Sequence, residues 1–179
     1  MPLNHENQEK LDNIIKTFKI YNPTNIPTKL AQMTSENDMF LSDHLPKNYK
    51  VTEEIYDFYI MTWNMLNKCH STAACSNQGS PYSNNPWNID ETSKQLNYRR
   101  AIQYKFILEQ IQNSIINGKA ISVIFLQEIS ELVSGMSKNN INETNIIAIL
   151  QKPTLTPEET GRLLAFDFLN NLEILGYKA

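Results

Sequence analysis

Residues 56–66, YDFYIMTWNML, decide the fold, because an aromatic and β-branched run ends there in a polar residue, Asn64. Such a run predicts a strand over Tyr56–Met61 that terminates at the asparagine. A second apolar run covers Ile121–Leu126, and its length and composition predict a strand buried on both faces. Glu128 stands just beyond the end of this run. The sequence therefore predicts two strands, each with a polar side chain at its carboxyl end.

Apolar residues at helical spacing occur between the two predicted strands, and again before and after them. Residues 92–117 form the clearest helix, with Gly118 where a C-cap is expected. Further helices are expected over Glu6–Ile20 and Glu143–Leu150. The expected buried stripe of the central helix consists of Tyr98, Ile102, Phe106, Ile107, Ile111 and Ile115.

A last helix is expected to begin at Thr156, which would cap it. Pro157 would occupy the first helical position, and Glu159 would close a capping box. The helix is expected to end at Gly176, after an apolar stripe that includes Phe168.

Composition sets the broad class of the chain. Its 179 residues, 41% hydrophobic and 20% charged, predict one globular domain. A formal charge of −3 disfavours binding of bulk duplex nucleic acid. No apolar run approaches the ~20 residues that span a bilayer, and the polar start of the chain lacks a signal peptide, which predicts a soluble protein. It is expected to be intracellular unless it is exported without such a signal.

Cys69 and Cys75 flank a short polar segment that also holds His70. Three candidate ligands are one short of a closed zinc site, and their spacing matches no common zinc pattern. Two reduced thiols in a surface loop are the simpler interpretation.

Asn64 and Glu128 are the first candidates for chemistry. Side chains at strand ends can converge while the backbone stays rigid. A carboxylate beside a neutral amide suits Mg²⁺, which takes one or two carboxylates and leaves its other positions to water and phosphate. The alternative is that the glutamate caps a following helix.

A second candidate is the segment Ser42-Asp43-His44-Leu45-Pro46. An imidazole titrates near neutrality, so His44 beside Asp43 could take a proton from water or hold a phosphoryl oxygen. The alternative is a short surface helix that begins at Ser42, with the histidine facing solvent.

Taken together, these motifs resemble the endonuclease/exonuclease/phosphatase superfamily, which has the DNase I-like fold. Thr62–Leu66 resembles its first strand, whose asparagine belongs to the metal and phosphate site. Ile124–Ile129 resembles the strand whose glutamate is the principal metal ligand. Tyr98-Arg99-Arg100, leading into a helix, matches the element between them, and Ser42–Pro46 resembles the final motif. The resemblance covers about residues 40–179.

The resemblance implies an α+β fold, as part of a four-layer α/β/β/α sandwich with two packed sheets and outer helices. Residues 39–179 would form this partial domain, and residues 1–38 an N-terminal extension of helix and loop. The implied activity is Mg²⁺-dependent phosphoester hydrolysis of a phosphorylated small molecule or a nucleic-acid end. Glu128 and Asn64 would hold the metal and His44 with Asp43 would be catalytic.

Arg99 and Arg100 would bind the substrate in the implied site.

The chain departs from the family pattern in two respects. The Ser-Asp-His motif normally comes last, so its early place implies a circular permutation, with Leu45–Val51 pairing antiparallel with Tyr56–Thr62. No Gly-Asp-x-Asn motif occurs, which implies an incomplete domain. The competing hypotheses are an inactive relative or fragment that acts as a protein-interaction module, and an unrelated helical interaction domain.

Overall fold

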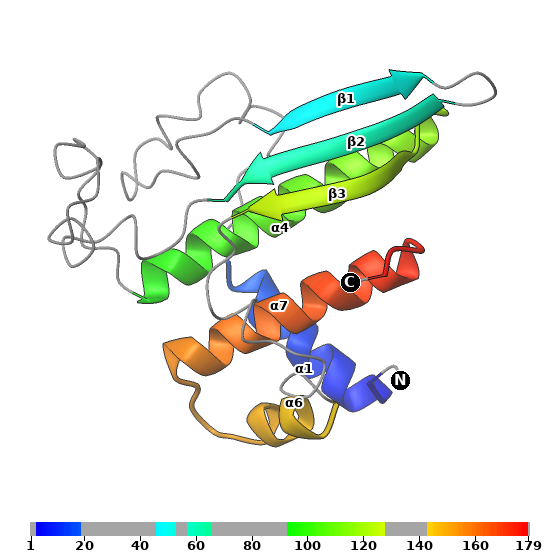
Figure 1. Ribbon diagram of the computed structural model, residues 1–179. Coiled ribbons are helices and arrows are strands. Elements are labelled where there is room, and N and C mark those ends of the chain that lie inside the picture. Colours follow the sequence, from blue (N-terminus) through cyan, green and yellow to red (C-terminus); the bar gives the residue numbers. More distant parts are fainter. Residues whose placement is uncertain (1–2, 19–45, 53–56, 66–92, 128–142, 179) are drawn as a thin grey trace, which may run out of the picture.

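The computed structural model describes residues 3–18, 46–52, 57–65, 93–127 and 143–178, and within these ranges the chain is an α+β protein. It contains four helices and a three-stranded sheet (Figure 1). In chain order the elements are α1 (His5–Lys16), β1 (Lys47–Thr52), β2 (Asp57–Asn64), α4 (Ser93–Ile116), β3 (Ile121–Gln127), α6 (Glu143–Leu150) and α7 (Pro157–Ile174). The predicted α+β class is confirmed.

The sheet has the order β1-β2-β3, with β2 in the centre. β1 and β2 pair antiparallel, with Lys47 opposite Thr62 at one end and Thr52 opposite Asp57 at the other. The hairpin expected from the sequence is therefore confirmed over the described residues. β2 and β3 pair in parallel, and α4 forms the connection between them that a parallel pair requires.

α4 lies against one face of the sheet, and α7 packs on α4 (Figure 1). Alternation along β2 directs Met61, Trp63 and Met65 into this core, where all three are buried. The Trp63 ring meets Phe106 of α4 edge-on, with centroids 5.4 Å apart. These contacts fix the long helix under the two parallel strands.

A second apolar cluster joins α1 to the C-terminal helices. Leu11 of α1, Ile146 of α6 and Leu163 of α7 are its most deeply buried members. The N-terminal helix thus shares a core with residues 143–178. The predicted domain boundary at residue 38 lies outside the described residues.

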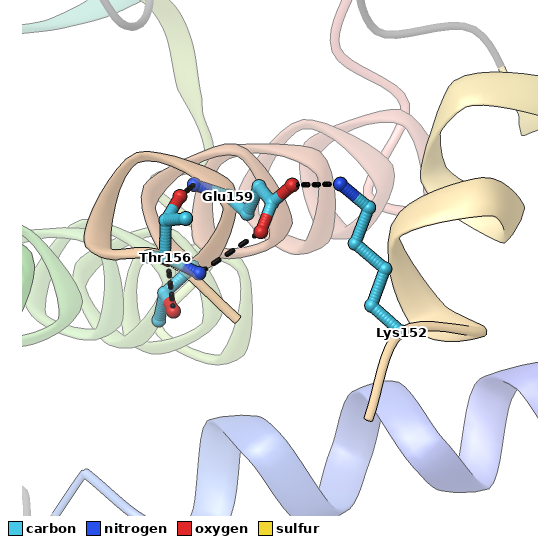
Figure 2. A network of polar contacts seen from close by, with 4 residues as sticks. Lys152, Thr156 and Glu159 are labelled. Atoms are coloured by element: carbon cyan, nitrogen blue, oxygen red, sulfur yellow. Dashed lines mark hydrogen bonds and ion pairs between the residues drawn. The ribbon is translucent and has the colours of Figure 1, made fainter. Parts of the chain in front are cut away.

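The start of α7 follows the capping prediction (Figure 2). The Thr156 hydroxyl accepts from the Glu159 backbone N–H at 3.2 Å, and the Glu159 carboxylate accepts from the Thr156 N–H at 2.9 Å. Lys152 adds an ion pair to the same carboxylate, and this contact lowers the pKa of Glu159. The end of the helix also agrees, because Gly176 adopts a left-handed φ of 90°.

Apolar side chains are exposed on the other face of the sheet, so the prediction that the third strand is buried on both faces is wrong. Val123 and Phe125 of β3 are 39% and 54% exposed. Tyr49 and Phe58 lie on the same face, which alternation assigns to the side away from α4. The run is apolar on both faces, but the described helices cover one of them.

One further expectation is corrected, and one is met only in part. Ile115, placed in the buried stripe of the central helix, is 46% exposed, because α4 extends there beyond the core. The described residues contain a single sheet, so the second sheet of the implied four-layer sandwich is not among them.

Candidate functional site

The carboxyl ends of β2 and β3 lie side by side. The register places Asn64 opposite Gln127, and the Met65 N–H donates to the Gln127 carbonyl at 2.9 Å. The two strands that carry the asparagine and glutamate motifs are therefore neighbours, as the sequence predicts. Gln127 is the residue opposite Asn64, and Glu128 directly follows it outside the described residues.

Polar side chains cluster at this end of the sheet, on the face away from α4. Alternation places Thr62 and Asn64 on that face, with Phe125 and Gln127 as their partners on β3. The Gln127 Nε2 atom donates to the Thr62 hydroxyl at 2.8 Å, and Asn64 is half-buried. An amide oxygen in this position is the kind of neutral ligand that a hard cation accepts.

The first turns of α4 bring two arginines beneath the end of β2. Arg99 and Arg100 are 1% and 3% exposed. Their Nη1 atoms donate to the Met65 carbonyl at 2.8 Å and 2.9 Å. Because both side chains are buried, the two arginines are better placed to hold the backbone of β2 than to contact a substrate directly.

Gln103 completes the cluster and is fully buried. Its Nε2 atom donates to the same Met65 carbonyl at 2.9 Å, while its Oε1 atom accepts from Arg100 Nη1 at 2.8 Å. Sequence reasoning missed this residue. The available signal was its place three residues after Arg100, since side chains at that spacing are neighbours on a helix.

The positive charge of this cluster acts on its surroundings. Burial raises the pKa of the Tyr104 phenol to about 12, and the two neighbouring guanidinium groups oppose that rise. The Tyr104 ring stacks on Phe168 of α7 with centroids 4.2 Å apart. The phenol therefore stays neutral, and the positive charge beneath the strand ends favours negative charge nearby.

The remaining predicted site residues lie outside the described ranges: Asp43, His44 and Glu128, together with Cys69 and Cys75. Among the described residues, no three His, Cys, Asp or Glu side chains form a group that could hold a metal ion. The described part of the candidate metal site is Asn64. Its amide oxygen is compatible with Mg²⁺, and a carboxylate has to come from a residue such as Glu128.

Comparisons with protein families, with curated proteins and with solved structures give no match to this chain. In the part of the chain that the structure describes, no helix has the length and apolar character required to cross a membrane. Assignment of a function therefore depends on the residues at the strand ends.

Proposed function

We propose that the chain carries part of the active site of a Mg²⁺-dependent phosphoesterase of the endonuclease/exonuclease/phosphatase type. The observation that carries the proposal is the parallel pairing of β2 with β3, which brings Asn64 opposite Gln127. The next residue along the chain is Glu128, the carboxylate of the second motif. Asparagine and glutamate motifs on adjacent parallel strands satisfy the first requirement of such a site.

In the proposed reaction, water attacks the phosphorus of a phosphoester and the ester oxygen leaves. Glu128 would provide a carboxylate and Asn64 a neutral oxygen for Mg²⁺, which when bound offsets the negative charge that develops on the phosphate. His44, with Asp43 beside it, would polarise the attacking water.

Arg99 and Arg100 would support the proposed site from beneath by holding the Met65 carbonyl and by contributing positive charge. The substrate would be a phosphorylated small molecule or a nucleic-acid end, since the net charge of −3 disfavours bulk duplex.

The proposal includes the four-layer sandwich. Its second sheet would pack on the exposed face that carries Tyr49, Phe58 and Phe125, because sandwiched sheets meet through alternating apolar side chains. Support comes from the one-sided arrangement of the described layers, in which α4 covers the opposite face. The domain would be incomplete as it stands, and the missing Gly-Asp-x-Asn motif is consistent with that.

Calorimetric titration with Mg²⁺ tests the proposal on three proteins: the wild type, Glu128→Gln and Glu173→Gln. The first substitution removes the proposed ligand's charge with little change in volume, and the second makes the same change at an exposed position on α7. We expect the wild type and Glu173→Gln to bind Mg²⁺ and Glu128→Gln to lose binding.

Equal binding by all three proteins would exclude Glu128 from the metal site. A wild type that binds no Mg²⁺ would favour the inactive relative that acts as an interaction module.

A further inference from the structure

The backbone of Met65, through its N–H and its carbonyl, is the junction at which β2, β3 and α4 meet. Its N–H donates to the Gln127 carbonyl of β3 at 2.9 Å. Its carbonyl accepts from Arg99, Arg100 and Gln103 of α4 at 2.8–2.9 Å. Asn64 directly precedes Met65 in the chain, so the position of Asn64 depends on how the Met65 backbone is held.

Three donors converge on one carbonyl oxygen, which has two lone pairs. Two of the donors are positively charged guanidinium groups, and burial of both strengthens their mutual repulsion. Gln103 both donates and accepts in this cluster. Its Nε2 atom donates to the Met65 carbonyl, and its Oε1 atom accepts from Arg100. A carboxylate at this position could accept but not donate, and a hydrocarbon side chain could do neither.

We propose that Gln103 is a positioning residue for the strand-end site. By donating to the Met65 carbonyl while holding Arg100, it fixes the end of β2 against β3 and so sets the position of Asn64 relative to Gln127. The effect of Gln103 on metal binding rests on the proposed phosphoesterase function, which supplies the ligand, Mg²⁺. The positioning itself concerns contacts among described residues.

Gln103→Glu and Gln103→Leu test the inference on the full chain, with Gln112→Glu and Gln112→Leu as matched controls. Gln112 lies on the same helix and is exposed. The glutamate variant keeps the size of the side chain and its contact with Arg100, so we expect its melting temperature to be retained or raised. It loses the donor to Met65, as the leucine variant does.

The first readout is hydrogen exchange of the Met65 amide, followed by NMR without metal. We expect both Gln103 variants to exchange this proton about tenfold faster than wild type, which corresponds to the loss of one ordinary hydrogen bond, and both Gln112 variants to leave its rate unchanged. A purely structural role would lower the melting temperature of Gln103→Glu without a selective change at Met65. Unchanged Met65 exchange in Gln103→Glu overturns the inference, and this variant decides the matter if Gln103→Leu fails to fold.

The second readout is the Mg²⁺ dissociation constant of the same proteins. We expect it to rise about tenfold in both Gln103 variants and to stay at the wild-type value in both Gln112 variants. An unchanged constant in Gln103→Glu overturns the effect of Gln103 on the metal site. A wild type that binds no Mg²⁺ counts against the proposed function, while the exchange rates still decide whether Gln103 positions the strand end.

Discussion

The two ends of α4 reverse the distribution of side chains that is usual for a helix of a globular protein. Its N-terminal part buries Arg99, Arg100 and Gln103, whereas its last turn exposes Ile115 and Ile116 by 46% and 80%. Arginine is rarely buried, and taking its charge out of water costs several kcal/mol before any compensating contact. Hydropathy alone would have placed these residues the other way round.

The difference teaches that position relative to the strand ends decides burial in this helix. The polar residues lie beneath the end of β2, where a backbone carbonyl accepts from all three. The isoleucines lie at the opposite end of the helix, where both side chains are exposed. Proteins depart from such local rules mainly at functional or strained sites, and the proposed site lies at the N-terminal part of α4.

The largest expected effect comes from one substitution made in the middle of α4 and again at its last residue. Ile107 is fully buried, so Ile107→Ala is expected to lower the free energy of unfolding by about 2–5 kcal/mol. Ile116→Ala removes the same atoms from an exposed side chain and is expected to change it by less than about 0.5 kcal/mol. Urea denaturation of both variants is the measurement. Equal losses would show that the last turn of α4 is covered in solution.

The second test compares the buried arginines with a half-buried carboxyl group that can lose its charge by taking up a proton. Burial and the charge of Asp12 raise the pKa of Asp167 on α7 to about 6. Arginine stays protonated in any protein environment, so the cluster beneath β2 cannot relieve its cost in this way. The raised pKa means that the folded state holds a proton on Asp167 more tightly than the unfolded state does.

The stability that Asp167 contributes is therefore fully present below its ordinary pKa of about 4, and it is lost as the pH rises through about 6. We expect the difference in unfolding free energy between wild type and Asp167→Asn to change by up to about 2–3 kcal/mol across this window. Denaturation at closely spaced pH values measures it, and the difference cancels carboxylates such as Glu159, whose lowered pKa acts in the opposite direction. A pH-independent difference would contradict the burial of this carboxyl.

The sequence predicted those features that depend on local rules. The expected pairing of β1 with β2 came from the permutation that the family resemblance implies, and the order of strand, helix and strand predicted that the strands carrying Asn64 and Gln127 are adjacent. Capping chemistry gave the start of α7 at Thr156. Each of these features is encoded within a short segment or by a direct connection.

Features that depend on what packs against an element were missed. Polar residues on a helix ordinarily indicate a solvated face, so the spacing of Gln103 from Arg100 marked the two as neighbours on the helix but did not mark Gln103 as buried. The apolar run of β3 predicted burial on both faces, but the exposure of Phe125 depends on which layers cover the sheet. Tertiary contacts decide the burial of Gln103 and the exposure of Phe125, and hydrophobic periodicity does not predict those contacts.

The smallest expected effect belongs to the cap of α7, the feature that the sequence predicted most fully. The Thr156 side chain satisfies one helical N–H at an exposed site, so Thr156→Ala is expected to lower the free energy of unfolding by about 1 kcal/mol. Lys152→Met removes the partly exposed ion pair to Glu159 and is expected to cost less than about 0.5 kcal/mol, falling further in high salt. Urea denaturation at two salt concentrations separates the two contributions, because the hydrogen bond of the cap is insensitive to screening. A cap substitution as costly as Ile107→Ala would show that α7 depends on its first turn more than on its packing against α4, and would weaken the conclusion that tertiary position governs this fold.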